Sequence, residues 1–291
     1  MDITTFSPIG SSISNTVSQK QANQFKHTPN ISSSILRLTI PFQSHPFISL
    51  SVNLSHLPVI IIAEDDRVLQ RLKHDPHIPP NNHQFTLERS QLTLTSAAGQ
   101  HDTGAQTWDS ANYKKMVSTR AALILEKLQQ GYHILYSDVD TVWRDNPVPY
   151  FDALGQFDMA AQTDDVPGEK TYPWYCTGFM ALRPTPATVE ALKDWNAQLQ
   201  TPQLNQPIFN TVMKRQKRQN GLVVKELPHR EFPHGGLYFR PTYTPAQRDQ
   251  AVVVHNNYIV GHGAKKKRWK TAKLWKLDAQ DQPIVDVVVR R

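Results

Sequence analysis

Two aspartates one residue apart, Asp138 and Asp140, follow a short apolar run at residues 134–136. Such a run is typical of a strand buried on both faces of a parallel sheet. Residues i and i+2 of a strand project to the same side, and at the carboxyl end of a strand in an α/β sheet that side is usually a crevice. Two neighbouring carboxylates repel each other unless a cation lies between them. The pair therefore predicts a site for a hard divalent ion that bridges to a substrate phosphate, although aspartates also occur in ordinary turns.

The elements around this pair alternate between strands and helices. Residues 110–130 form the clearest helical pattern, because Tyr113, Val117, Ile124 and Leu128 recur at helical intervals and Gly131 suits a C-terminal cap. Further helices are predicted at residues 66–74, 185–199 and 206–218. Strands are predicted at residues 35–40, 58–63, 134–136, 157–161, 177–182 and 252–254, with a weaker pattern at 91–95. Strands that alternate with helices predict a doubly wound, mostly parallel α/β sheet flanked by helices.

The polar N-terminal segment contrasts with the rest of the chain. Residues 1–34 are rich in Ser, Thr, Asn and Gln, and a segment with so little apolar surface cannot offset its ordering entropy. We expect residues 1–34 to be disordered. Residues 35–291 show no repeat and no linker, so we expect them to form a single domain.

The overall composition limits the partners but does not select one. The formal net charge of +7 over 291 residues points to an anionic partner such as nucleic acid, acidic lipid or a phosphorylated small molecule. The single cysteine, Cys176, excludes an intrachain disulfide, and we interpret it as a small buried hydrophobe. No run approaches the roughly 20 apolar residues of a membrane span, and the N-terminus has no signal pattern. We expect no membrane anchor within this chain.

Several longer stretches, taken together, resemble the nucleotide-diphospho-sugar transferase family. That family includes plant xylosyltransferases that act on pectin and related animal sequences named UDP-xylose:fucose xylosyltransferases. The resemblance implies a GT-A fold, a divalent metal that is usually manganese, a UDP-sugar donor, a glycan acceptor, retention of configuration and a Golgi-lumen location. The matching stretches span about residues 58–275 in the family's order and read GYHILYSDVDTVWRDNPVPYF, YCTGFMALRPTPATVEALKDW, NQPIFN, FPHGGLYF and AVVVHNNYIVGHGAKKKRW.

The resemblance assigns a metal site to three residues. Asp138 and Asp140 resemble the family's Asp-x-Asp pair, in which Asp140 binds the metal and Asp138 binds the metal or the donor's ribose and sugar. His255 resembles the late histidine that completes the site, and a neutral imidazole is a suitable ligand for manganese beside carboxylates. A lone histidine is otherwise more often a satisfied core residue, but the following Asn256 and Asn257 favour the ligand.

The resemblance also assigns residues to the donor. Gly261 and Lys265 resemble the diphosphate-binding residues, since glycine permits a close backbone approach and lysine supplies charge. Thr177 and Gly178 fall in a matched stretch and are expected to contact the donor. The basic cluster at residues 265–268 is equally typical of a nuclear import signal or a nucleic-acid-binding patch.

The sequence departs from the family's pattern at the residues expected near the reacting sugar. Relatives usually have an acid before the glutamine of the late motif, where this chain has Asn205-Gln206. Neither amide is an anionic nucleophile, so we expect retention by front-face attack, with the departing diphosphate accepting the acceptor's proton. Gln206 would orient the sugar and Asp165 would bind its hydroxyls, with Asp164 as a neighbouring carboxylate.

Two other classes of protein compete with this assignment. Residues 138–142 also satisfy the nucleophile signature of haloacid-dehalogenase-type phosphatases, in which the first aspartate is phosphorylated. That signature normally ends the first strand of its domain, whereas a βα unit precedes Asp138, and the expected lysine motif is absent. The second alternative is a basic nucleic-acid-binding protein that uses residues 265–268, but no nucleic-acid motif accompanies them, so we expect no nucleic acid among the partners.

Overall fold

The computed structural model of the protein describes residues 35–40, 59–63, 66–74, 85–89, 107–165 and 173–275. All of them lie in one compact unit, Ile31–Arg291. The segment 1–34 and the weak strand pattern at 91–95 lie outside the described residues, so the disorder of the first and the domain boundary after it stay predictions. Within the described ranges, no helix combines the length and apolar character that crossing a bilayer requires.

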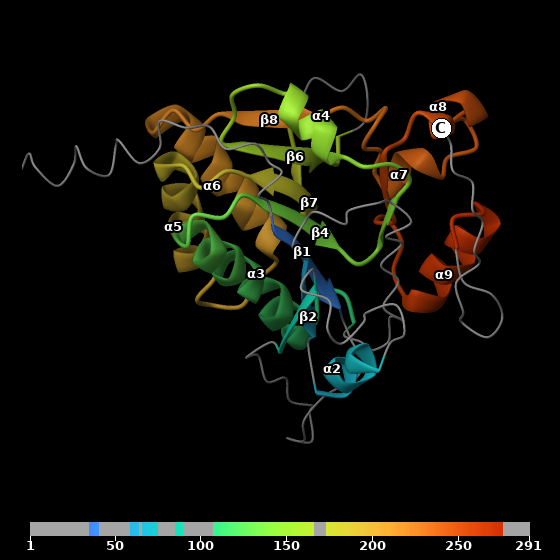
Figure 1. The fold of residues 1–291 in the computed structure, drawn as a ribbon, viewed down its shortest axis with the longest axis horizontal. Helices are drawn as coiled ribbons and strands as arrows, with labels where there is room; N and C mark the ends of the chain where they lie inside the picture. The colour runs from blue at the N-terminus through green and yellow to red at the C-terminus, as the bar shows by residue number, and fades with distance from the viewer. Residues whose placement is uncertain are drawn as a thin grey trace, which may run out of the picture. The chain divides into compact units, whose positions relative to one another are not determined.

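The main sheet has seven strands in the order β3-β2-β1-β4-β7-β6-β8 (Figure 1). β7 runs antiparallel to both its neighbours, and the other strands share one direction. The prediction of a mostly parallel sheet is therefore confirmed. The strands are β1 (Ile35–Ile40), β2 (Val59–Ala63), β3 (Phe85–Arg89), β4 (Ile134–Asp138), β6 (Met159–Thr163), β7 (Tyr175–Leu182) and β8 (Val224–Leu227).

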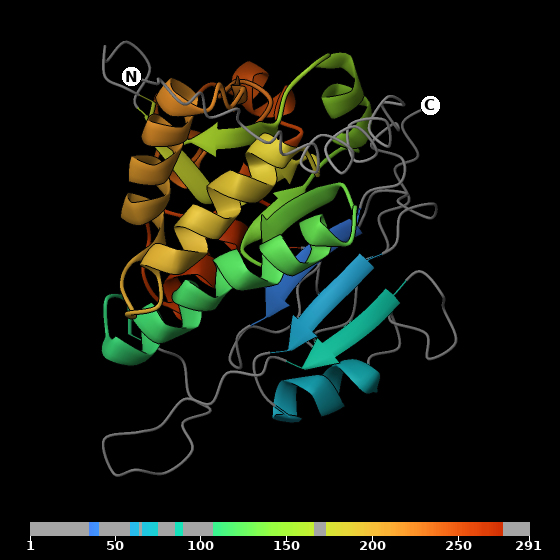
Figure 2. The same ribbon diagram turned by 90° about the vertical axis from the view of Figure 1, so that its left-hand side faces the viewer.

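Alternating side chains of the central strands supply two separate cores. On β4, Tyr136 belongs to the core under three helices, while Leu135 belongs to the core on the other face. The helices α3 (Ala111–Gln129), α5 (Pro186–Gln198) and α6 (Asn205–Gln219) lie side by side over the first face (Figure 2). On the opposite face, Phe179 of β7 stacks on Phe232 with ring centroids 5.7 Å apart. Both faces of the central strands are thus buried, as their apolar runs predicted.

The helix ends follow ordinary capping chemistry. The Ser110 side chain accepts a hydrogen bond from the Tyr113 amide and begins α3, and Gly131 follows that helix with a φ of 87°. Thr185 caps α5 in the same way, and Pro186 occupies the first turn. The short helix α2 (Asp66–Lys73) follows β2 as predicted.

A small second sheet was not predicted from the sequence. β5 (Thr141–Trp143) pairs antiparallel with β9 (Val253–His255), and Thr141 is the register partner of His255. Short strands of three residues give little periodic signal, which is why the pairing could not be foreseen. This pairing places the residues that follow the aspartate pair beside a strand from the late part of the sequence.

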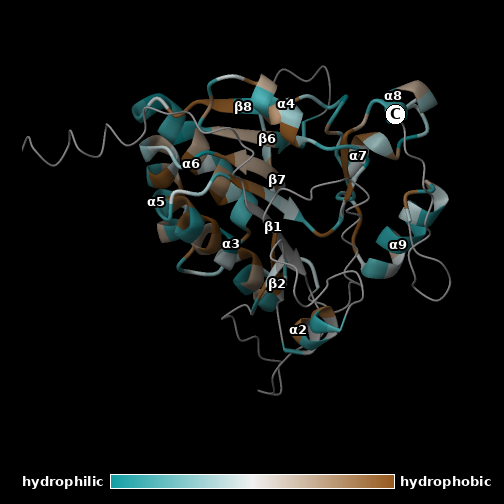
Figure 3. Cartoon of the chain, viewed as in Figure 1, coloured by the Kyte–Doolittle hydropathy of each residue, from teal (hydrophilic) through white to brown (hydrophobic). Residues whose placement is uncertain are grey.

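Four further helices complete the described chain. α4 (Val148–Ala153), α7 (Gly235–Tyr238) and α8 (Pro245–Asp249) are short, and α9 (His262–Thr271) is the longest of the four. α9 is mostly hydrophilic along its length, in contrast to the strands of the main sheet (Figure 3). Residues 256–261 connect it to β9.

Candidate metal and donor site

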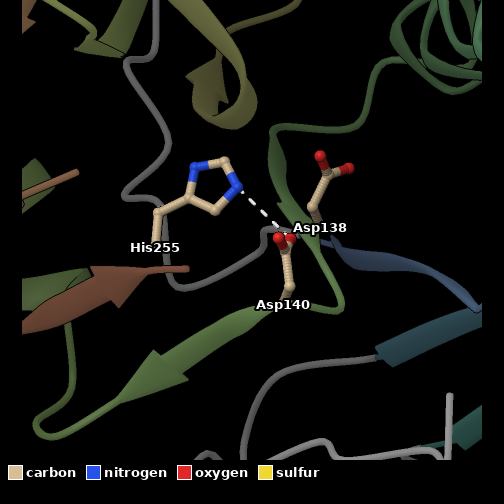
Figure 4. A group of neighbouring side chains, drawn as sticks. All are labelled: Asp138, Asp140 and His255. Atoms are coloured by element: carbon tan, nitrogen blue, oxygen red, sulfur yellow. Dashed lines mark ion pairs between the residues drawn. The ribbon is translucent and has the colours of Figure 1, made fainter. Parts of the chain in front are cut away.

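Asp138, Asp140 and His255 converge where β4, β5 and β9 meet (Figure 4). One potential ligand atom from each lies within 4.8 Å of the others. Asp140 Oδ1 is 3.2 Å from His255 Nε2. The convergence that the resemblance implied is present, but the geometric reason given for it needs correction. β4 ends at Asp138, and a turn rather than strand alternation places Asp140 beside it.

Gly178 lines this cluster from the neighbouring strand β7. A Cβ at this position would lie 2.4 Å from His255 Cε1, 2.8 Å from Asp138 Oδ2 and 3.0 Å from His255 Nε2. A side chain here would therefore collide with two of the three potential ligands. The absence of a Cβ leaves a small cradle bordered by a carboxylate oxygen and an imidazole nitrogen, which is a fitting environment for a divalent ion.

Gln162 fixes the proton position on His255. Its side-chain Nε2 donates to the Phe232 carbonyl at 3.0 Å, so its Oε1 is the atom that faces His255 Nδ1 at 2.9 Å. A carbonyl oxygen only accepts, so Nδ1 carries a proton and, in the neutral imidazole, Nε2 presents its lone pair to the cluster. Gln162 and His255 are both buried. Sequence analysis missed Gln162, because a glutamine in a buried strand has no motif around it.

The electrostatics of the cluster stabilise a charged Asp140. Burial disfavours its anion, but Lys265 and His255 outweigh burial and hold the pKa of the Asp140 carboxyl well below its usual range. Lys265 Nζ lies 2.5 Å from Asp140 Oδ2. Burial alone would lower the pKa of His255, but the neighbouring Asp140 raises it well above its ordinary value. The predicted diphosphate ligand Lys265 thus lies directly at the acidic cluster.

Arg120 of α3 holds the other aspartate. Its guanidinium donates to Asp138 Oδ1 at 2.7 Å, to Thr177 Oγ1 at 2.7 Å and to the Thr177 carbonyl at 3.0 Å. Burial opposes its charge, yet Asp138 raises the pKa of Arg120. This residue was also missed, although a charged residue spaced with the buried Val117 and Ile124 of α3 was a readable signal.

Gln206, at the start of α6, connects Thr177 to Asp164. Its Oε1 accepts from the Thr177 amide at 3.2 Å, and its Nε2 donates to Asp164 Oδ2 at 2.8 Å. The other oxygen of that carboxylate accepts from Asn257 Nδ2 at 2.9 Å. The Asp165 carboxylate instead accepts from the Trp174 amide, with both oxygens at 3.0 Å. Of the two adjacent aspartates, Asp164 is the one that contacts Gln206.

Asn205 is buried beside this network. Its carbonyl accepts from Trp195 Nε1 at 3.1 Å, and its side-chain Nδ2 has no hydrogen-bond partner among the described residues. A buried amide without a partner is costly. Asn205 is therefore a buried residue at the start of α6, next to Gln206.

The basic cluster of residues 265–268 is divided between two environments. Lys265 points to Asp140, and Arg268 donates to Asn256 Oδ1 at 2.7 Å and to the Asn257 carbonyl. Gly261 precedes the helix with a φ of 93°, which only glycine adopts readily. Lys265 therefore serves the acidic site and Arg268 holds the segment after β9, which argues against an undivided surface for nucleic acid.

Comparisons with known proteins agree with this arrangement. The family profile described as nucleotide-diphospho-sugar transferase matches residues 55–269. UDP-D-xylose:L-fucose alpha-1,3-D-xylosyltransferase 3 of Arabidopsis thaliana is 31% identical over 265 residues, which cover 82% of this chain and 64% of that protein. UDP-D-xylose:L-fucose alpha-1,3-D-xylosyltransferase MGP4 of the same plant is 30% identical over 271 residues, covering 84% and 70%. The chain thus spans less than two thirds of the first relative's length.

A solved structure supports the fold. The glycosyltransferase GlyE of Streptococcus pneumoniae TIGR4 superposes with a TM-score of 0.51 at 13% identity, over 82% of this chain and 59% of that chain. The mostly parallel sheet with the acidic cluster at the carboxyl end of β4 is a GT-A-like α/β fold. The chain belongs to the nucleotide-diphospho-sugar transferase family. This membership disfavours the haloacid-dehalogenase alternative, for which Asp138 would be a nucleophile.

Proposed function

We propose that the protein is a metal-dependent, retaining glycosyltransferase that moves a sugar from a UDP-sugar to a glycan hydroxyl. The observation that carries the proposal is the convergence of Asp138, Asp140 and His255 with Lys265 beside them. A nucleotide diphosphate is an anion of high charge density, and its binding needs both a cation site and a positively charged side chain.

The metal and the diphosphate would be held by separate groups. Asp138, Asp140 and His255 would hold a divalent ion, with manganese the expected one, and such an ion supplies positive charge to the departing diphosphate. Lys265 would bind a phosphate oxygen from the start of α9, and Gly261 would admit the diphosphate close to the backbone. Thr177 and Gly178 would form the wall of the donor site on β7.

The sugar side of the site contains amides and carboxylates, and His234 Nε2 lies 3.2 Å from the Asp165 carbonyl. Gln206 would orient the sugar, since its amide is fixed by Thr177 and Asp164. Asp164 is well placed to accept from a sugar hydroxyl, and Asp165 stays a second candidate for that role. Because neither Gln206 nor the buried Asn205 is an anionic nucleophile, we infer front-face attack, in which the leaving diphosphate takes the acceptor's proton.

The donor and acceptor are proposed from the relatives' names. The two plant relatives are named for UDP-xylose and fucose, so UDP-xylose with methyl α-L-fucopyranoside is the first pair to test, followed by other pentose and hexose donors. A Golgi-lumen location is proposed from the same resemblance. Expression of the full chain with an organelle marker would test the location.

The activity test measures UDP release from a panel of UDP-sugars with manganese. We expect release that disappears in a chelator and returns when manganese is restored, and no release by the Asp140→Ala variant, whose thermal unfolding is measured to show that it is folded. Full turnover in chelator would contradict the metal assignment. Proton NMR of the fresh product from an α-linked donor tests the stereochemistry, because an inverting enzyme would give a β-linked product. A glycosyl adduct trapped on Asp164 or Asp165 would replace front-face attack by double displacement.

A further inference from the structure

Tyr258 combines an unusual backbone with an exposed ring. It lies between β9 and α9, its φ is 58°, and 59% of its surface is exposed. A non-glycine residue in the left-handed region is uncommon and costs free energy unless its surroundings impose that conformation. Because most of the Tyr258 side chain is exposed, its burial contributes little to folding.

Neighbouring contacts hold this backbone in place. The preceding residue, Asn257, accepts from the Gly235 amide through its Oδ1 at 2.6 Å, and its carbonyl accepts from Arg268. Its Nδ2 donates to Asp164 Oδ1. Three hydrogen bonds of Asn257 thus hold the backbone that leads into Tyr258.

The ring itself is anchored at its edge and on one side. Its hydroxyl donates to the Asp164 carbonyl at 2.8 Å. Its centroid lies 5.0 Å from that of His234, and a Cβ on Gly236 would lie 3.0 Å from Tyr258 Cγ. Burial of the hydroxyl and the nearby Asp164 raise the pKa of Tyr258, so the phenol stays protonated and keeps this hydrogen bond at neutral pH. The rest of the ring faces solvent.

The position of the anchor links the ring to the sugar side of the site. Asp164 is the same residue whose carboxylate contacts Gln206. The groups proposed to hold the donor, such as Thr177 and His255, are 2% and 3% exposed. A glycan acceptor reaches the site from solvent, and two exposed aromatic side chains lie next to the two aspartates. Trp174, 42% exposed, pairs through its backbone with Asp164 and Asp165, and Tyr258, 59% exposed, bonds to the Asp164 carbonyl. Of these two, Tyr258 is the one with a left-handed backbone.

We propose that the open side of the Tyr258 ring is an acceptor subsite, on which the apolar face of a saccharide ring stacks. Aromatic rings suit this role because they offer a large, rigid apolar area at low entropy cost. The inference rests on the proposed glycosyltransferase function. It goes beyond that function by naming the residue that receives the acceptor.

Saturation-transfer NMR with methyl α-L-fucopyranoside and methyl β-D-galactopyranoside tests the subsite without turnover. We expect saturation of the C–H protons of at least one glycoside by the wild-type protein. Tyr258→Leu keeps a branched side chain at the same φ but removes the ring, and should weaken that binding between about 2- and 12-fold. Tyr258→Phe keeps the ring and should keep most of the signal. Tyr132→Leu is the matched control, because Tyr132 is exposed at the opposite, amino-terminal end of β4.

Two further readouts separate failure of the subsite from failure of the function. Tyr258→Leu should leave the UDP affinity unchanged and raise the acceptor KM in the UDP-release assay. The subsite would be overturned if the wild type saturates neither glycoside, or if wild type and Tyr258→Leu saturate them equally. It would also be overturned if Tyr258→Leu loses as much UDP affinity as glycoside affinity. No UDP release from any UDP-sugar by the wild type would contradict the proposed function instead. Thermal unfolding of each variant checks that it is folded.

Discussion

The Oε1 of Gln162 faces the Nδ1 of His255 at 2.9 Å, and the other end of the same amide is held by the Phe232 carbonyl. The hydrogen bond fixes which imidazole nitrogen is available to a cation. A residue of the main sheet therefore sets the chemistry of a residue on the small second sheet.

Replacement of Gln162 should weaken metal binding. Gln162→Leu removes the amide acceptor for Nδ1–H and leaves the longer contact to Cys176 Sγ at 3.6 Å, so the tautomer and ring orientation of His255 are held less firmly. We expect manganese affinity to fall about 10- to 100-fold, as is usual for partners of metal-bound histidines. The measurement is the EPR signal of free Mn²⁺ in a titration. Gln216→Leu is the control, because Gln216 is also a buried glutamine but bonds to Asp194; an equal loss in both variants would mean that a general structural change is responsible.

Gly178→Ala should close the cradle at the acidic cluster. Its Cβ would lie 2.4 Å from His255 Cε1 and 2.8 Å from Asp138 Oδ2, both in groups held by other contacts. We expect the loss of detectable manganese binding by calorimetry and a drop in stability of about 1–3 kcal/mol from overpacking. Gly263→Ala is the matched control, because a Cβ there meets nothing within 4 Å. Unimpaired metal binding by Gly178→Ala would place the ion elsewhere.

Lys265→Ala should weaken the binding of UDP. Loss of one charge-assisted contact costs about 1.5–3 kcal/mol, or roughly 10- to 150-fold in affinity. Lys267→Ala, two residues along the same helix and exposed, should leave UDP affinity within about twofold, because an exposed charge contributes little. Titration calorimetry with UDP and manganese makes the comparison. Unchanged UDP affinity in Lys265→Ala, with weaker binding to nucleic acid, would favour the basic-protein alternative.

The stability should depend on pH through Asp194. Burial alone would raise its pKa, but hydrogen bonds from Arg215, Gln216 and Gln198 outweigh it and lower the pKa of the Asp194 carboxyl. A carboxyl with a depressed folded-state pKa stabilises the protein above its unfolded pKa of about 3.9 and loses that effect as the pH falls through the folded value. Asp194→Asn should therefore cost about 1 kcal/mol at neutral pH, and less below about pH 4. Urea unfolding at several pH values measures this, with the exposed Asp249→Asn as the control that should show no such trend.

Much of the fold could be predicted because its strands and helices are long enough to show a period. The helix over residues 110–130 appears as Ala111–Gln129, and the apolar run before Asp138 appears as a central strand buried on both faces. β3 at Phe85–Arg89 was not predicted, although Phe85 and Leu87 alternate with polar residues, because five residues are too few for a clear period. β8 was missed for a similar reason, since Val224–Leu227 is half polar and lies at the sheet edge.

The site was predictable where a motif repeats the family's order and not where chain folding alone creates it. Asp138, Asp140, His255 and Lys265 were each identified and lie together in the structure. Arg120 and Gln162 bond to residues that are distant in the sequence, and such pairs cannot be predicted from a single sequence. Their hydrogen bonds form only when the folded sheet brings the partners together.

The pairing of β5 with β9 also determines the order in which the protein can be assembled during synthesis. Every strand of the main sheet has left the ribosome once Leu227 has emerged, whereas His255 and Lys265 follow later. Domains generally begin to fold as their residues emerge, so the sheet and its helical layer can form while the acidic pair still lacks its histidine and lysine. A cation that contacts Asp138, Asp140 and His255 together can therefore bind only after His255 has emerged, when the described strands of the main sheet have already been synthesised.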